Sequence, residues 1–299
     1  MMVHVDLLTP EIIGIVGVGV VSGVLSGLLG VGGATVSTPG VRAFGATPIQ
    51  AVGSTIPAVL PSAIIGAWRS ARAGLVDWRV ALTCGLAGSI AAVGGAVLSD
   101  AIDPHLLMIA TAAVLLWSGA TVLASGRRSE AAATFDAVID DELDQLLSDS
   151  APGQGSGPLA LDAPPALAPA VTLSTGLIAL VGAAAGLVAG LLGLGGGVVL
   201  MPLFTGVLAI PVKRAVPTSL VAVALFSIPA LVTHTLLGHV DWVIAMALVV
   251  GVIPGARLGS RWAQVASEAV VTRLFGLFLV ALAIVAGASE FHGLLAIIH

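Results

Sequence analysis

The sequence predicts an all-α polytopic membrane protein built from two inverted repeats. The chain is 58% hydrophobic and 9% charged, apolar runs recur along it, and a glycine-rich motif occurs twice, 163 residues apart. Soluble domains carry about 25% charged residues, and a helix needs about 20 apolar residues to cross the hydrocarbon core of a bilayer. Composition therefore excludes an ordinary soluble domain, and the repeated motif predicts two related halves.

Eight apolar runs are candidate membrane segments. Strands of a membrane β-barrel would be shorter and would alternate in polarity, which these runs do not. The first residues show neither the basic region nor the cleavage site of a signal peptide, and the single cysteine, Cys84, excludes an intrachain disulfide. The runs lie at 11–30, 48–68, 80–99, 104–124, 172–193, 215–236, 242–260 and 270–288.

The two halves align segment by segment. GLLGVGG at 27–33 matches GLLGLGG at 190–196, and GLVDW at 74–78 matches GHVDW at 238–242. These matches divide the chain into an N-terminal membrane repeat (1–124) and a C-terminal membrane repeat (171–299), each with about four hydrophobic segments. Residues 125–170 between them are acidic and rich in proline and glycine, which favours a solvated cytoplasmic tether. A regulatory or partner-binding role is the alternative for this linker.

The basic residues, which collect on the cytoplasmic side of membranes, indicate how often each repeat crosses. If all eight runs cross, the eleven basic residues divide five against six and give no orientation. If each glycine-rich stretch is instead the tip of a re-entrant hairpin, each repeat crosses three times. Ten of the eleven basic residues then share one side, with Arg42 opposite. We therefore predict six crossings, two re-entrant hairpins, both termini outside and the linker inside.

The glycine-rich tips are predicted to meet near the membrane midplane. Non-helical backbone at that depth is tolerated only where it is buried in protein or lines a cavity, and glycine adopts positive φ without strain. The returning arm of each hairpin would begin a new helix whose free N–H groups and positive dipole end bind an anion without lysine or arginine. Close packing of helices is the structural alternative for such glycines.

The predicted substrate-binding residues are the two tips and a duplicated pair of hydroxyl residues that follows each tip. For the hydroxyls, capping or bonding back to a helix carbonyl is an equal alternative to ligand contact. The predicted set is Gly30, Gly32, Gly33, Ala34, Gly193, Gly195, Gly196, Gly197, Ser54, Thr55, Thr218 and Ser219.

The first returning arm is more polar than the second. Thr35, Ser37 and Thr38 correspond to Val198, Leu200 and Met201, so the site is asymmetric if these hydroxyls touch substrate. Asp77 and Asp241 occupy duplicated helix starts beside tryptophans, which is typical of helix caps at a membrane interface.

Proton coupling has little support in the sequence. His234, near the outer end of the sixth run, could carry protons, but we favour a partnered histidine at the interface. No titratable residue lies clearly at mid-membrane, where a proton relay would need one.

Enzyme motifs are missing from the sequence. It contains no Gly-x-Ser-x-Gly, no His-Glu-x-x-His and no Walker sequence, which are the local patterns of common hydrolase, metalloprotease and nucleotide sites. We expect no enzymatic activity, no cofactor, no metal site and no nucleic-acid partner.

The paired GLLGVGG…P and GLLGLGGG…P motifs, each followed by a polar, proline-bearing helix, resemble the TauE/SafE sulfite exporter family over residues 12–124 and 172–288. The resemblance implies a multi-pass permease in the plasma membrane of a bacterium or archaeon that moves sulfite, sulfoacetate or other organosulfonates, usually outward. Two features depart from the family pattern: the first motif reads Gly32-Gly33-Ala34, one glycine short, and the acidic linker is additional.

Alternating access with the anion held between the tips is the expected mechanism. An inside-negative potential would drive the anion outward without a coupling ion. The partners expected are a small anion and membrane lipid, and the sequence leaves the oligomeric state open. An anion channel, a permease for another small anion such as thiosulfate or a carboxylate, and a non-transporting scaffold are the alternatives.

Overall fold

The computed structural model describes residues 10–29, 32–124, 174–262, 273 and 276–284. Within these ranges the secondary structure is helical, with no strand, which confirms the predicted all-α class, while the inverted relation of the two repeats stays a prediction. The predicted linker 125–170 and much of the last apolar run fall outside them. The helices are α1 (Pro10–Leu29), α2 (Ala34–Ala43), α3 (Pro48–Arg72), α4 (Trp78–Ala101), α6 (Thr175–Leu192), α7 (Gly197–Gly206), α8 (Val212–Leu236) and α9 (Trp242–Trp262), with a further helix Pro104–Ala124 after α4 and helical residues at 276–284.

Seven helices in the described ranges are long and apolar enough to cross a membrane, and α2 and α7 are ten-residue helices between them. Large apolar side chains point outward from the long helices: Ile90 on α4 and Leu236 on α8 are 81% and 82% exposed. Leaving such side chains in water is unfavourable, whereas hydrocarbon accepts them. The protein is therefore a multi-pass membrane protein.

The duplicated aspartates begin two of the long helices. An Asp77 carboxylate oxygen accepts a hydrogen bond from the backbone N–H of Val80 at 3.1 Å, at the start of α4. An Asp241 carboxylate oxygen accepts one from the N–H of Val243 at 2.9 Å, at the start of α9. These contacts satisfy first-turn N–H groups, which confirms that both residues act as helix caps.

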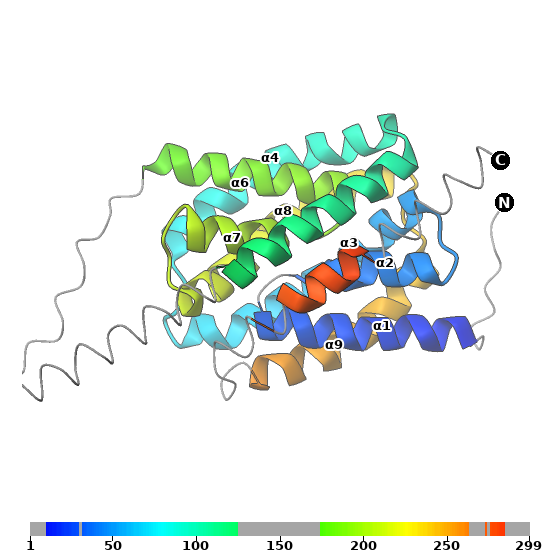
Figure 1. The fold of residues 1–299 in the computed structure, drawn as a ribbon, viewed down its shortest axis with the longest axis horizontal. Coiled ribbons are helices and arrows are strands. Elements are labelled where there is room, and N and C mark those ends of the chain that lie inside the picture. The colour runs from blue at the N-terminus through cyan, green and yellow to red at the C-terminus, as the bar shows by residue number, and fades with distance from the viewer. Residues whose placement is uncertain (1–9, 30–31, 125–173, 263–272, 274–275, 285–299) are drawn as a thin grey trace, which may run out of the picture.

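The helices pack in two close pairs, α1 with α9 and α4 with α6, which lie along opposite edges of the molecule (Figure 1). Glycine makes both contacts close. A Cβ built on Gly23 of α1 would lie 2.4 Å from the carbonyl oxygen of Val252, and one built on Gly186 of α6 would lie 2.1 Å from the carbonyl oxygen of Gly88. Each interface therefore admits no larger side chain at these positions, as in other small-residue helix contacts within membranes.

These two pairs correspond under the internal duplication, because α1 corresponds to α6 and α9 to α4. Each repeat thus packs its first helix on a helix of the other repeat. The glycine motifs also contact the other repeat. A Cβ built on Gly27 would lie 2.5 Å from the carbonyl oxygen of Ala256, and one built on Gly190 would lie 2.0 Å from the carbonyl oxygen of Ala92. The first glycine of each motif therefore serves helix packing, which was the structural alternative considered for these glycines.

Contacts along the helices give their directions. The beginning of α1 lies beside the beginning of α9, at Ile12 and Trp242, and their ends meet at Gly27 and Ser260. In the same way α4 and α6 run parallel, from the contact of Arg79 with Thr175 at 3.1 Å to the contact between Gly95 and Leu187. Inverted repeats predict such reciprocal pairs. The number of crossings and the side of a bilayer that each end faces stay predictions.

Candidate functional site

The first glycine-rich stretch is the tip of a helical hairpin. α2 turns back along α1: a Cβ built on Gly33 would lie 2.8 Å from the hydroxyl oxygen of Ser22, and one built on Gly14 would overlap the ring of Phe44, just beyond α2. The chain therefore leaves the hairpin at the end where it began. The arms are unequal, since α1 has 20 residues, which rise about 30 Å, and α2 has ten.

The second hairpin repeats this geometry. α6 ends at Leu192, and Gly193, Gly195 and Gly196 have φ values of 64°, 72° and 66° before α7 begins at Gly197. A Cβ built on Gly196 would lie 3.0 Å from the carbonyl oxygen of Ala185, the residue that corresponds to Ser22. Three left-handed positions within four residues favour glycine, so the repeated motif specifies the turn.

The two tips contact each other in the interior. A Cβ built on Gly32, where φ is 73°, would lie 3.6 Å from the carbonyl oxygen of Gly195, and one built on Gly195 would lie 3.6 Å from the Cβ of Ala34. The side chain of Val59 on α3 lies 3.6 Å or less from both positions. The predicted meeting of the tips is thus present in the structure, while their depth in a bilayer stays a prediction.

Both returning helices begin without a side-chain cap. Gly33 and Gly196 are the N-cap residues of α2 and α7, and neither helix start receives a side-chain hydrogen bond from its cap. The positive ends of two helix dipoles are therefore directed toward one interior region. The tips are buried at 32–35 and at 192–202, so neither tip opens to the surface within the described residues.

Hydroxyl groups surround the first tip. The Ser22 hydroxyl donates to the carbonyl oxygen of Gly33, the Ser37 hydroxyl donates to the Ser22 oxygen at 2.8 Å, and the Gly33 N–H donates to the Ser62 oxygen at 3.4 Å. All three serines are completely buried. They make the first tip a buried polar cluster without a charged side chain among these groups.

Ser26 adds a hydroxyl on the same helix that is unpaired among the described residues. It lies one turn after Ser22 on α1 and is 1% exposed, and its oxygen has no hydrogen-bond partner within the described part of the chain. An unsatisfied buried hydroxyl costs about 1–3 kcal/mol. Such a group is expected where a ligand or water supplies the missing partner.

The second tip lacks this cluster. A Cβ built on Gly196 would lie 2.6 Å from the ring of Phe226, whereas the corresponding Gly33 faces hydroxyls. The surroundings of the capping glycine are therefore polar at Gly33 and apolar at Gly196, an asymmetry that the returning arms already indicate in the sequence. The serines at 22, 26, 37 and 62 correspond to Ala185, Ala189, Leu200 and Phe226.

Thr55 is the predicted hydroxyl that contacts a tip. Its hydroxyl oxygen lies 3.2 Å from the carbonyl oxygen of Gly193 and 3.3 Å from the hydroxyl oxygen of Thr38. It also lies 2.9 Å from the carbonyl oxygen of Val52 on its own helix. Thr55 and Thr38 therefore link the first repeat to the turn of the second hairpin.

The other three predicted hydroxyls make capping and back-bonding contacts. Ser54 accepts a hydrogen bond from the Asp241 N–H at 2.8 Å, and Thr218 accepts one from the Asp77 N–H at 3.0 Å. Ser219 donates to the carbonyl oxygen of Val216 at 2.8 Å. Ser54 and Thr218 thus hold the starts of α9 and α4 in the other repeat, whereas Ser219 bonds back to its own helix, as the alternative interpretation of these hydroxyls expects.

The remaining predicted residues divide between the tips and the undescribed part of the chain. Ala34 and Gly197 are the first residues of α2 and α7 and are buried at the meeting point. Gly30 lies outside the described residues. Ser22, Ser26 and Ser62 were missed by sequence reasoning, although two serines one turn apart in the apolar run of α1 are a signal of a polar helix face.

His234 lies inside the protein. It is completely buried on α8, and its ring nitrogens lie 3.0 Å from a ring nitrogen of His239 and 2.8 Å from the carbonyl oxygen of Gly190. The histidine is therefore partnered, as we predicted, but it lies in the protein interior and not at the membrane interface.

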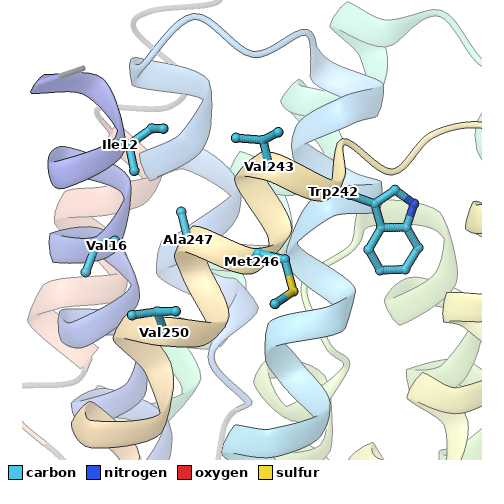
Figure 2. A pocket seen from close by; sticks show the side chains of 7 residues that line it. All are labelled: Ile12, Val16, Trp242, Val243, Met246, Ala247 and Val250. Atoms are coloured by element: carbon cyan, nitrogen blue, oxygen red, sulfur yellow. The ribbon is translucent and has the colours of Figure 1, made fainter. Parts of the chain in front are cut away.

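A groove on the outer surface contains no ligands for an anion. It has a volume of about 480 Å³ and lies between α1 and α9 (Figure 2). Apart from the indole of Trp242, the side chains that line it are hydrocarbon or thioether. The groove is therefore chemically suited to apolar chains and is separate from the hairpin tips. Its lining is Ile12, Val16, Trp242, Val243, Met246, Ala247 and Val250.

Two hairpins with broken helices that meet between two related membrane repeats are the architecture of a secondary transporter. The chain belongs to the sulfite exporter TauE/SafE family, whose model matches residues 15–286. The predicted family is thus confirmed, and the protein is a multi-pass membrane transporter.

Relatives of the chain carry transporter names. Probable membrane transporter proteins of Xylella fastidiosa, strains 9a5c and Temecula1, are each 28% identical to it over 273 residues, which is 90% of this chain and 92% of each relative. The probable membrane transporter protein YunE of Bacillus subtilis is 40% identical over 75 residues, 25% of this chain and 28% of that protein. No solved structure matches the chain.

Proposed function

We propose that the protein exports small sulfur-containing anions, such as sulfite, sulfoacetate or another organosulfonate, by alternating access across the plasma membrane of a bacterium or archaeon. The observation that supports this most directly is the meeting of two uncapped helix N-termini, at Gly33 and Gly196, beside the buried hydroxyls of the first repeat. The sulfur-oxyanion class comes from the family.

The chemistry of the tips suits an oxyanion. Each helix N-terminus carries about half a positive charge, and its N–H groups donate to oxygens in the way that anion sites at helix starts commonly do. The Ser26 hydroxyl is a free donor within the described part of the chain, one turn from Ser22. A sulfite or sulfonate group accepts several such hydrogen bonds at once, because its three oxygens share the charge.

The closed tips imply a movement in each transport cycle. The buried stretches 32–35 and 192–202 must part on one side and then on the other for the anion to pass. The two exchanged interfaces, α1 with α9 and α4 with α6, present small residues across which one unit can slide or rock. An inside-negative potential contributes about 2.3 kcal/mol per charge per 100 mV to outward movement of an anion.

Lipid covers the outward apolar side chains and the groove between α1 and α9. The repeats at 1–124 and 171–299 are the two moving units, and the acidic linker 125–170 tethers them on the cytoplasmic side.

Sulfite flux in proteoliposomes under an imposed membrane potential tests this function. We expect saturable flux that increases with the potential and is reduced by sulfoacetate or thiosulfate, in an order that ranks the substrates. Flux that does not saturate would instead indicate a channel. If none of these anions moves, the sulfur-anion proposal is wrong.

A further inference from the structure

A buried chain of hydrogen bonds joins two histidines to an exposed carboxylate. His234 Nε2 lies 2.8 Å from the Gly190 carbonyl oxygen, His234 Nδ1 lies 3.0 Å from His239 Nδ1, and His239 Nε2 lies 3.1 Å from an Asp100 carboxylate oxygen. His234 and His239 are 0% and 5% exposed, whereas the Asp100 side chain is 62% exposed. The chain thus runs from a backbone carbonyl inside the protein to a carboxylate at its surface.

The hydrogen bonds determine how many protons the pair His234 and His239 holds. A carbonyl and a carboxylate only accept, so both Nε2 atoms carry a hydrogen. The contact between the two Nδ1 atoms needs one further hydrogen, on either ring. Three hydrogens on two imidazoles are one more than two neutral rings hold, so all three contacts can form together only when the pair has bound one extra proton, opposite the carboxylate of Asp100.

Loss of that proton cannot leave all three contacts in place. Two neutral imidazoles offer two N–H groups for three contacts, so a lone pair must then face the Gly190 carbonyl, the Asp100 carboxylate or the other ring. Each of these arrangements is repulsive, and one contact opens. Asp100 provides the route by which the proton leaves, from His239 Nε2 to the carboxylate and then to solvent.

The pair lies where four elements meet, close to the second hairpin. Gly190 is in the last turn of α6, three residues before the hairpin turn begins at Gly193, and Asp100 is in the last turn of α4. His234 is on α8, and His239 follows α8 and packs against Gly53 of α3. Proton loss therefore weakens the contacts that hold α6, the first helix of the second hairpin, against α8 and α4.

The neighbouring charged groups are few within the described residues. α3 faces the pair with Gly53, α6 with Gly190 and α4 with Asp100. Asp241, two residues after His239, directs its carboxylate to the N–H groups of α9. The corresponding positions of the first repeat hold Ser70 and Leu75, so this arrangement belongs to one end of the molecule.

We propose that His234 and His239 form a binding site for one coupling proton, which is taken up and released through Asp100 in each transport cycle. This inference rests on the proposed transport function and adds a coupled ion to it. It replaces the uncoupled mechanism that the sequence favoured, because the relay lies within the protein and adjoins the moving hairpin.

The first test measures anion flux in proteoliposomes with the membrane potential clamped at zero and a pH gradient imposed. The wild type is expected to change its flux by about tenfold with the gradient, within the usual range of coupling between two sites. His234→Gln and His239→Gln keep an amide donor but take up no proton, so both are expected to lose the response of flux to the pH gradient. His105→Gln, a third histidine outside the pair, is the control. Active variants with the wild-type pH response would overturn the proposal.

The second test uses the wild-type protein alone. It needs no substrate, and it does not depend on whether a variant folds. Nitrogen NMR spectra of the ¹⁵N-histidine-labelled wild-type protein in lipid nanodiscs are recorded from about pH 5 to about pH 9. Two histidines are expected to titrate together with a single proton step, because strongly coupled groups share their titration. Buried rings that stay neutral throughout would refute the proton site. A wild type that shows this step but moves no anion would contradict the proposed transport function alone.

Discussion

Ser54 on α3 accepts a hydrogen bond from the backbone N–H of Asp241 at 2.8 Å, across the boundary between the two repeats. The corresponding residues make the same contact in the opposite sense, because Thr218 accepts from the N–H of Asp77 at 3.0 Å. Each repeat therefore holds the start of a long helix in the other.

Removing these hydroxyls should weaken the joint between the repeats. Ser54→Ala and Thr218→Val each leave a backbone N–H without its partner, at a cost of about 1 kcal/mol. We expect both variants to lower the midpoint of thermal unfolding in detergent. Thr121→Val, which removes a hydroxyl that bonds only within its own helix in the described contacts, is the control. Midpoints unchanged from the wild type would show that these bonds do not stabilise the repeat interface.

The turn of the second hairpin should not tolerate a side chain. Gly196 has φ of 66°, and a Cβ there would lie 2.6 Å from the ring of Phe226. Left-handed backbone costs about 1–2 kcal/mol for a residue with a Cβ, so Gly196→Ala should lose stability and most transport. Gly206→Ala, at the other end of α7 with nothing within 4 Å, should behave as the wild type. Equal transport by both variants would contradict this role of Gly196.

Ser26 should separate substrate affinity from stability. Because its hydroxyl is buried without a partner among the residues that the structure describes, Ser26→Ala should not reduce thermal stability. Loss of a hydrogen bond to a charged ligand costs about 1.5–3 kcal/mol, so the KM for the anion should rise about tenfold or more. Ser99→Ala, which removes a buried serine that bonds to the Ala96 carbonyl at 2.7 Å, should leave KM unchanged. A wild-type KM in Ser26→Ala would place the substrate elsewhere.

The packing of α1 on α9 depends on one face of α1. A Cβ on Gly19 would lie 2.6 Å from the Leu248 carbonyl oxygen, so Gly19→Val should separate the helices and reduce the yield of folded protein. Gly17 is exposed on the same helix with nothing within 4 Å, and Gly17→Val should fold normally. Size-exclusion profiles of the two variants distinguish them, and similar profiles would argue against close packing here.

The duplicated glycines made the hairpins predictable, because glycine is the residue that adopts the positive φ found at Gly195 and Gly196 without strain. The same residue type did not reveal that Gly27 and Gly190 serve helix packing, since a glycine that turns and one that packs look alike in a sequence. With 20 residues, α1 is long enough to cross a membrane, so its length alone did not indicate a re-entrant arm. Only the contacts of α2 with α1 show that the chain turns back.

The polar groups that matter most were the least predictable. Ser62 meets Gly33 across 29 positions, and Asp100 meets His239 across 139. Neither contact has a local signature, because it depends on how the helices pack. His234 could be picked out by its chemistry, but its partners could not.

The central claim is that an anion binds where the two tips meet, and Gly33→Leu tests it most directly. Gly33 has an ordinary helical φ of −58°, so leucine there is not strained by the backbone, but its side chain would extend toward the hydroxyl of Ser22. The measurement is potential-driven sulfite flux in proteoliposomes with equal amounts of inserted wild-type, Gly33→Leu and Gly17→Leu protein. We predict saturable flux in the wild type and in Gly17→Leu, and its loss in Gly33→Leu. Sulfite flux through Gly33→Leu equal to that of the wild type would contradict the account.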